Sequence, residues 1–143
     1  MIVLDTNVVS ELQRPTPHAG VVSWVRRQDP SDLAITAVTA SELLYGMARL
    51  PQGQRSRLLA EAFEVLVTDV FDGRVLPFDL SAARLTGMIR AQRRAAGRAI
   101  SDADAQIAGT CLLYGAALVS RDRRGFEGTG VELIDPWTVG GLG

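Results

Sequence analysis

The chain opens with four apolar residues, Met1–Leu4, which are followed at once by Asp5 and by two small polar residues, Thr6 and Asn7. A run that is apolar at successive positions is typical of a strand buried on both faces, as in a parallel sheet. Ligands of such sheets bind beyond the carboxyl ends of the strands, which is where Asp5 would project. The opening therefore predicts a parallel sheet with a carboxylate at its ligand-binding edge.

Short apolar runs alternate with longer segments of helical periodicity along the rest of the chain. The predicted strands cover 33–36, 74–78, 116–120 and 131–134. The predicted helices cover 6–13, a segment around Val21, Trp24 and Val25, a segment that begins at 39, then 54–67, 79–94 and a segment that begins at 101. The first would have Thr6 or Asn7 as its N-cap. The helix over 54–67 would place Leu58, Leu59, Ala62, Phe63 and Leu66 on one face. This alternation predicts an α/β fold around a mainly parallel sheet, in a single domain over 1–143 whose tail, 138–143, is flexible.

Composition narrows the possible chemistry. Cys111 is the only cysteine, which excludes an intrachain disulfide and a zinc site of several thiolates. His18 is the only histidine, so a serine or cysteine nucleophile would depend on it, and its proline-rich surroundings favour a solvated loop. Hydrolytic chemistry would therefore rely on carboxylates and a hard metal ion.

The totals are those of an ordinary globular chain. Of its 143 residues, 47% are hydrophobic and 22% are charged, and the net charge of -1 does not single out a nucleic-acid binder. No apolar stretch approaches the roughly 20 residues that cross a bilayer, and no basic region precedes an apolar core at the N-terminus. We therefore expect a cytoplasmic protein without membrane association.

Four acidic residues lie where a predicted element begins or ends. Asp5 and Asp122 follow strands, whereas Glu42 and Asp104 fall in the first turns of helices, Asp104 on the apolar face. Each acid could instead have a purely structural role. Thr39–Glu42 has the pattern of a capping box, and Ser101–Asp104 has that of an acidic variant. Asp5 and Asp122 could accept hydrogen bonds from the backbone amides of turns. Several acids converging on one cleft would repel one another unless Mg²⁺ or Mn²⁺ holds them. Their joint placement therefore favours metal binding over four coincident caps.

Several short segments of the chain resemble the motifs of a known protein family. The matching pieces are Leu4–Asn7, Glu42-Leu43, Asp104–Thr110 and Ser120–Asp122, together with 74–79 and the closing Asp135-Pro136-Trp137. In their order and spacing they resemble PIN-domain ribonucleases of the VapC type, and within these the FitB-like group. The pieces extend from one end of the chain to the other.

The resemblance implies a three-layer α/β/α fold and cleavage of single-stranded or structured RNA that depends on Mg²⁺ or Mn²⁺. It also implies a toxin that forms a homodimer and is neutralised by a cognate VapB-type antitoxin, with DNA reached only through that antitoxin. One departure is Asp102, an extra acid where the family often has a small residue or proline. We interpret Asp102 as a helix cap.

On this interpretation Asp5 and Asp104 are the main metal ligands, and Glu42 and Asp122 complete the shell directly or through water. The supporting residues would be Thr6, Asn7 and Ser120, with Asp102 as a further candidate. Arginines at helical spacing (Arg90, Arg94 and Arg98) and arginines beside the acids (Arg121, Arg123 and Arg124) are candidates for contact with RNA or antitoxin. For the first set we slightly favour a solvated helix face.

Three alternatives compete with this interpretation. A haloacid-dehalogenase-type phosphotransferase also begins with an aspartate after a buried strand, but it needs a second aspartate where this chain has Asn7. A metal-dependent DNA nuclease would use the same acids. A catalytically weak PIN protein would act mainly as the partner of a DNA-binding antitoxin in transcriptional autoregulation.

Overall fold

In the computed structural model, which describes residues 1–139, five parallel strands form the central sheet. They are β1 (Ile2–Leu4), β2 (Leu33–Thr36), β3 (Val75–Leu76), β4 (Ala117–Val119) and β5 (Leu133–Ile134), in the order β3-β2-β1-β4-β5. β1 is central and pairs with β2 through Ile2↔Leu33 and with β4 through Val3↔Leu118. The predicted parallel sheet is confirmed, with the Asp5 strand in the middle.

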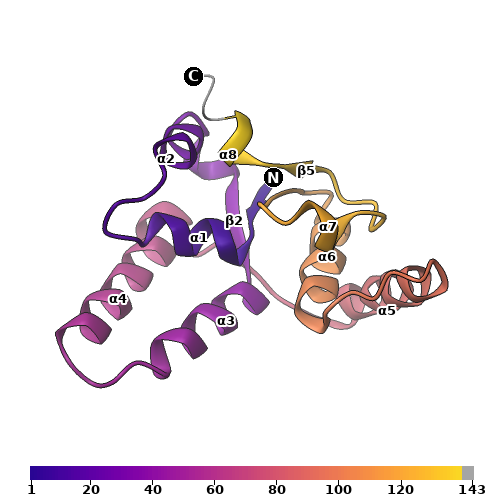
Figure 1. Ribbon diagram of the computed structural model, residues 1–143, viewed down its shortest axis with the longest axis horizontal. Helices are drawn as coiled ribbons and strands as arrows, with labels where there is room; N and C mark the ends of the chain where they lie inside the picture. The colour runs from indigo at the N-terminus through magenta and orange to yellow at the C-terminus, as the bar shows by residue number, and fades with distance from the viewer. Residues whose placement is uncertain (140–143) are drawn as a thin grey trace.

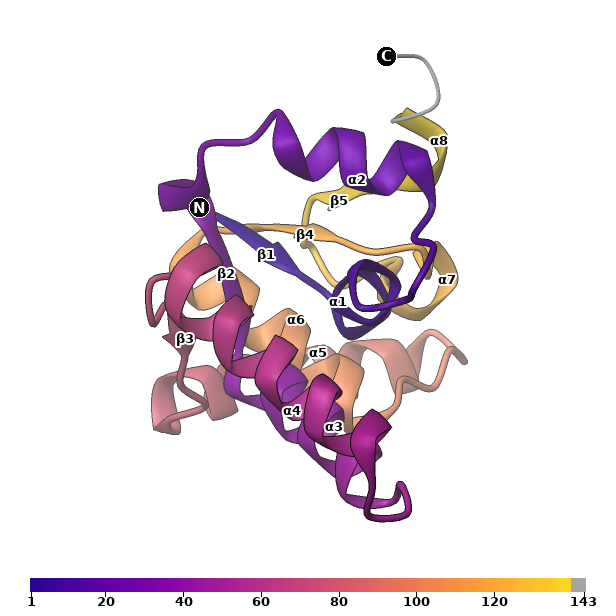
Figure 2. The same cartoon turned by 90° about the vertical axis from the view of Figure 1, so that its left-hand side faces the viewer.

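The helices form a layer on each face of this sheet. They are α1 (Thr6–Leu12), α2 (Ala19–Arg26), α3 (Ala37–Ala48), α4 (Gln54–Val65), α5 (Leu80–Ala95), α6 (Asp102–Tyr114), α7 (Arg123–Phe126) and α8 (Pro136–Val139), with a 3-10 turn at Pro30–Asp32 and a π-helical turn at Leu66–Val70. One core joins residues of α1 to α4 with one face of the sheet, and a second core joins α5, α6 and α7 with the other. Figures 1 and 2 show this α/β/α arrangement, which confirms the predicted layers.

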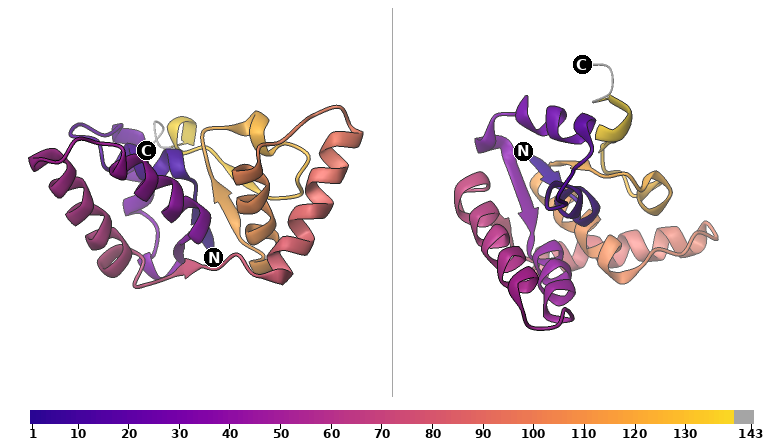
Figure 3. Two further views of the ribbon diagram at one scale, coloured as in Figure 1. Left: turned by 90° about the horizontal axis from the view of Figure 1, so that it is seen from below. Right: turned by 60° about the vertical axis from the view of Figure 1, so that its left-hand side comes forward.

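The pleat of β1 explains why both of its faces are apolar. Leu4 packs into the core beneath α1, α2 and α4, whereas Val3 packs into the core beneath α5 and α6. Side chains of a strand alternate between the two faces of its sheet, so a strand between two helical layers needs apolar residues at successive positions. Figure 3 shows α4 and α5 at opposite sides of the molecule, with the sheet between them.

A close approach between α5 and α6 fixes the layer that carries Asp104. A Cβ at Gly109 would lie 2.2 Å from the hydroxyl oxygen of Thr86, so only glycine allows this packing. The Thr86 hydroxyl donates to the carbonyl of Ala82 and also lies 3.3 Å from the carbonyl of Ala105 in α6. Gly109 therefore allows α6 to lie close to Thr86 and to the backbone of α5.

Several predicted boundaries are corrected. The N-cap of α1 is Asp5, not Thr6 or Asn7, because the carboxylate accepts the first free N–H of the helix. Leu58 does not join the buried face of α4; it is 56% exposed while Phe63 is buried. The first two residues of the tail predicted to be flexible, 138 and 139, belong to α8, and residues 140–143 lie outside the described residues.

Candidate active site

Asp5 is buried at the carboxyl end of β1, with 4% of its surface exposed. Its backbone N–H donates to the carbonyl of Val119 at 2.9 Å, which continues the pairing of β1 with β4. Side-chain Oδ1 accepts from the N–H of Thr6 at 2.8 Å. Oδ2 accepts from the Ser120 hydroxyl at 2.7 Å and from the Asn7 amide at 3.2 Å. Both oxygens of this carboxylate are therefore fixed in orientation.

Asn7 and Ser120 carry the network from β1 to the loop after β4. The Asn7 amide donates to Ser120 Oγ at 3.2 Å, and Asn7 Oδ1 accepts from the backbone N–H of Arg121 at 3.3 Å. Ser120 Oγ in turn accepts from the N–H of Asp122 at 3.0 Å. The loop that bears Asp122 is thus held against the Asp5 carboxylate.

Thr6 connects the start of α1 with Glu42 of α3. Its hydroxyl donates to Glu42 Oε1 at 2.7 Å and lies 3.2 Å from the Thr39 hydroxyl. The predicted first-turn position of Glu42 is wrong, as is its capping box with Thr39. The helix begins at Ala37, and its cap is Thr36, whose hydroxyl accepts from the N–H of Thr39 at 3.0 Å.

Asp104 and Asp122 meet across the backbone of Gly125. Asp104 is the third residue of α6, whose predicted cap Ser101 is confirmed by its hydrogen bond from the Asp104 N–H at 3.2 Å. Asp122 caps α7 by accepting from the Gly125 N–H at 2.9 Å. A Cβ at Gly125 would lie 2.3 Å from Asp122 Oδ2 and 3.2 Å from Asp104 Oδ2. Both carboxylates therefore press on the same residue.

The electrostatics of the site reflect burial and mutual repulsion. Burial raises the pKa of Asp5 to about 6 despite the hydrogen bonds that it accepts, and the charges of Asp104 and Glu42 add to the rise. Burial also raises the pKa of Asp104, with further contributions from the charges of Asp122 and Glu42. These effects link all four acids, so the structure brings the predicted residues into one electrostatic unit.

The donors of this site suit a hard divalent cation. Carboxylate and hydroxyl oxygens are the ligands that Mg²⁺ and Mn²⁺ prefer, and the repulsion among the acids would be relieved by a cation. Within residues 1–139, no three carboxylate, imidazole or thiol groups are arranged as a ready-made metal centre. The residues fit such an ion in chemistry and charge.

Asp102 does not cap α6 as predicted, because Ser101 already occupies that position. As the first residue of the helix, Asp102 points to α5 and pairs with Arg90 at 3.1 Å. Both side chains are exposed, so this ion pair contributes little to stability. Its effect is to neutralise Arg90 in part at the rim of the site.

The predicted arginine stripe ends at Arg94. The last helical residue of α5 is Ala95, and Gly97, with a φ of 73°, turns the chain before Arg98. Arg98 therefore leaves the helix face and pairs with Glu127 at 2.5 Å. Arg94 stays exposed beside Arg90 in a shallow groove formed with residues 99 and 100. The helical spacing of the sequence does not extend to Arg98.

Arg121 lies beside the acids and stacks over an aromatic ring. Its guanidinium carbon is 5.1 Å from the ring centroid of Trp137, while its backbone N–H donates to Asn7. A cation above an aromatic face is attracted by the ring quadrupole. Trp137 of α8 thus supports the charged side chain that directly precedes Asp122.

The histidine and the cysteine take no part in the acidic site. His18 is exposed in the loop before α2, as predicted, and its Nδ1 accepts from the Gly20 N–H at 3.1 Å and caps that helix. Cys111 is fully buried in α6, and burial raises the pKa of its thiol to about 12. An unreactive thiol and an imidazole engaged as a cap leave the chemistry to the carboxylates.

The sequence reasoning missed three residues at this site. Thr39 is fully buried beside Thr6, Gly125 separates two carboxylates, and Arg93 is 5% exposed with its guanidinium in the loops around the site. A glycine three residues after an acid is the one available signal for Gly125. The signal for Arg93 is its position four residues after the apolar Ile89 on the buried face of α5, whereas the exposed arginine that follows it lies off this face.

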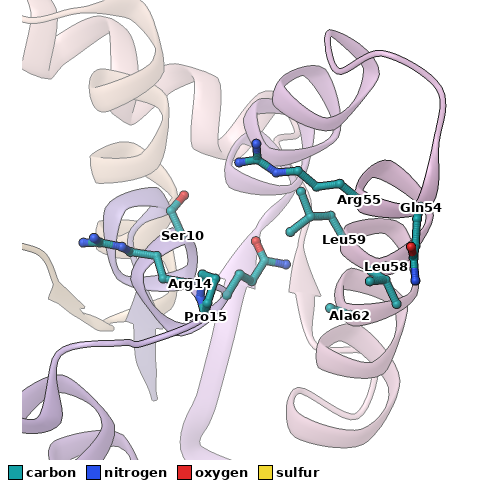
Figure 4. A pocket seen from close by; sticks show the side chains of 9 residues that line it. Ser10, Arg14, Pro15, Gln54, Arg55, Leu58, Leu59 and Ala62 are labelled. Atoms are coloured by element: carbon teal, nitrogen blue, oxygen red, sulfur yellow. The ribbon is translucent and has the colours of Figure 1, made fainter.

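A groove of about 680 Å³ lies between the end of α1 and α4, and none of the four acids lines it. Figure 4 shows Arg14 and Pro15, just beyond α1, opposite Leu58 and Leu59 of α4. The groove is mainly apolar, and its wall includes Gln13, whose side-chain nitrogen is buried with no hydrogen-bond partner within residues 1–139. Its lining therefore suits a partner that brings apolar side chains.

Comparisons with known proteins agree with this geometry. The PIN domain family model matches residues 2–131. A VapC ribonuclease, Y4jK of Sinorhizobium fredii, is 40% identical over 137 residues, which cover 96% of this chain and 98% of that protein. Toxin FitB of Neisseria gonorrhoeae is 36% identical, with 96% of this chain and 99% of that protein covered.

Solved structures show the same similarity in three dimensions. The crystal structure of FitAcB from Neisseria gonorrhoeae superposes with a TM-score of 0.89 over 96% of this chain and 99% of that chain, at 36% identity. The structure of FitAB bound to an IR36 DNA fragment gives the same TM-score and identity over 96% of each chain. Among the described residues, no helix combines the length and the apolar character needed to cross a membrane.

Proposed function

We propose that this chain, which belongs to the PIN-domain family and to its VapC-type group of toxins, is a metal-dependent endoribonuclease restrained by a cognate antitoxin. The observation that carries the proposal is the convergence of Asp5, Glu42, Asp104 and Asp122 at the carboxyl edge of the sheet. RNA as the substrate is supported by the relative named VapC ribonuclease, which is similar along nearly its whole length.

The four acids would hold Mg²⁺ or Mn²⁺, with Asp5 and Asp104 as its main ligands. When bound, such an ion supplies a nucleophile from water at neutral pH and positive charge beside the scissile phosphate. The chain's own contribution is orientation. Ser120 and Asn7 fix one oxygen of Asp5, and Thr6 fixes one oxygen of Glu42.

The RNA would approach along the exposed arginines at the rim. Arg121 stands next to the acids, supported by Trp137, and Arg94 is exposed farther out on α5. Arg90 is partly neutralised by Asp102 and would contribute less. A strand of RNA binds through phosphate contacts of this kind, so cleavage would weaken as the salt concentration rises.

The antitoxin would dock in the groove between α1 and α4. Leu58 is 56% exposed there, and the unpartnered Gln13 amide needs an acceptor. Arg14 and Arg55 flank the apolar lining, so a partner segment with apolar side chains and carboxylates would fit. We expect this chain to reach DNA only through such an antitoxin, since the FitAB complex was solved on a DNA fragment.

A homodimer is the expected oligomeric state. Apolar side chains stand exposed on α3 and α5, with Tyr45 at 64%, Leu80 at 66% and Met88 at 57%. Light scattering of the purified protein, measured with and without antitoxin, tests this expectation. A strictly monomeric toxin at micromolar concentration would contradict it.

The main test compares single-stranded RNA and DNA of the same sequence as substrates. The antitoxin-free wild type is assayed with EDTA, Mg²⁺ or Mn²⁺, next to Asp104→Asn and to Glu61→Gln, an exposed acid of α4 as control. We expect metal-dependent cleavage of RNA alone, lost in Asp104→Asn and kept in Glu61→Gln.

Two other outcomes would establish the alternatives. Equal cleavage of DNA would make the protein a DNA nuclease. Tight antitoxin binding without cleavage of either substrate would make it the catalytically weak partner of an autoregulating antitoxin.

A further inference from the structure

Arg93 is a buried arginine on a helix whose neighbouring arginines face solvent. It is 5% exposed, whereas Arg90 and Arg94 are exposed on the same helix. No acidic side chain within residues 1–139 forms an ion pair with it. A buried charge of this kind is stable only when its donors are satisfied by other means.

Every N–H of the Arg93 guanidinium donates to a backbone carbonyl. Nε donates to Arg98 at 2.9 Å, Nη2 donates to Ala99 at 3.3 Å, and the Arg124 carbonyl accepts from both Nη1 and Nη2, at 3.3 and 3.4 Å. Nη1 also donates to the carbonyl of Glu127. Five donors thus meet four carbonyls, two before α6 and two in and just after α7.

These two segments lead directly to two of the four acids. The first segment runs into Ser101, the cap whose hydroxyl accepts from the Asp104 N–H. The second surrounds Gly125, whose N–H donates to Asp122 and where a Cβ would press against both carboxylates. The guanidinium therefore joins the backbone that carries Asp104 to the backbone that carries Asp122.

We infer that Arg93 is a positioning residue that sets the separation of the Asp104 and Asp122 carboxylates, and so the affinity of the site for a divalent cation. This inference rests on the proposed function. The planar guanidinium has donors in a fixed fork, whereas a lysine ammonium has three donors on a flexible stem. Lysine at position 93 keeps the charge and loses the geometry.

The test measures Mn²⁺ binding by calorimetry, without any RNA. Removal of residues that orient metal ligands lowers affinity by about 10–100-fold, and we expect a loss of this size in Arg93→Lys. Arg84→Lys is the matched control, since Arg84 is an exposed arginine of the same helix, and its affinity should equal that of the wild type. Circular dichroism confirms that each variant is folded.

A double-mutant cycle separates positioning from a general structural role. In an Asp122→Asn background, Arg93→Lys should cost much less Mn²⁺ affinity than in the wild type, because the carboxylate through which Arg93 acts is gone. Equal losses in both backgrounds would overturn the inference. If Arg93→Lys does not fold, Gly125→Ala takes its place, because its methyl group would force the same two carboxylates apart.

The outcomes distinguish this inference from the proposed function. A wild type that binds Mn²⁺, next to an Arg93→Lys variant that binds it equally well, overturns the inference alone. Unchanged affinity in Gly125→Ala does the same where that variant carries the test. A wild type that binds no Mn²⁺ overturns the proposed function and this inference with it.

Discussion

The two ends of α1 present opposite kinds of surface. At its start, Asp5 is buried and accepts hydrogen bonds on both carboxylate oxygens. At its end, Gln13 holds a buried amide nitrogen that has no partner in the described part of the chain, beside a largely apolar groove. Satisfied polar groups keep a geometry fixed, whereas an unmet donor next to exposed apolar surface favours association. One short helix thus separates a preorganised acidic site from a surface suited to a partner.

The largest effect should come from Asp5→Asn at the first of these ends. We expect RNA cleavage to fall on the order of 10²–10³-fold, as when one preorganised electrostatic group is removed from an active site. Antitoxin affinity should stay the same, because Asp5 does not line the groove. Initial cleavage rates and antitoxin titrations on the same preparation measure both quantities. Equal losses in both would show that the two ends are not separate.

Much of this site could be predicted from the sequence because strand ends are marked locally. Short apolar runs followed by Asp5 and by Ser120–Asp122 define the edge of a parallel sheet, and the structure brings these residues together. Helix starts were less readable. Thr36 and Thr39 are both residues that commonly cap helices. Thr36 is the cap in the structure, because it is the last residue of β2, has an extended backbone and accepts from the first turn of α3.

Helical spacing from Ile89 places Arg93 on the buried face of α5, but its contacts could not be predicted from the sequence. Its five hydrogen bonds go to carbonyls, which every residue carries, so no side-chain pattern marks them. Leu58 was placed on the buried face because its spacing matches Ala62 and Leu66, yet the end of α1 does not cover it. Helical periodicity predicts which residues share a face of the helix. Whether each of them is buried depends on neighbours that are far away in the chain.

The second prediction concerns the stability of the same Asp5→Asn variant without metal. Folding raises the pKa of Asp5 from 3.8 to about 6, so between these pH values the folded protein binds more protons than the unfolded chain. The free energy of unfolding therefore falls as the pH rises through this window. At pH 7 the cost reaches at most about 3 kcal/mol, which asparagine would relieve.

Urea unfolding in EDTA from pH 4 to 7 measures this difference. Asp5→Asn should be more stable than the wild type at pH 7, and the advantage should shrink towards pH 4. Glu61→Gln, which removes an exposed acid, should show no such trend. A wild type whose stability rises across this window relative to Asp5→Asn would contradict the burial of a charged Asp5.

At the other end of α1, Leu58→Asp should weaken antitoxin binding by about 2 kcal/mol or more, roughly 30-fold. The exposed leucine contributes apolar surface to the groove, and a carboxylate there would lose it. Cleavage of RNA by the free toxin should be unchanged. Leu113→Asp, at an exposed leucine of α6 outside the groove, is the control. If Leu58→Asp binds the antitoxin as tightly as the wild type does, the antitoxin must bind to another surface.

The smallest effect is expected from Gln13→Leu, which tests most directly whether the end of α1 is suited to a partner. Because the Gln13 amide nitrogen is buried without a partner in the described residues, replacing it should stabilise the free protein by about 1 kcal/mol. If the antitoxin supplies the missing acceptor, the same change should lower its affinity by a similar amount. Thermal unfolding and calorimetric titration measure the two terms on one variant. A gain in the stability of the free protein together with a loss of antitoxin affinity would mean that the Gln13 amide donates to the partner. A loss of stability in the free protein would mean that Gln13 already has a hydrogen-bond partner and that packing alone shapes the groove.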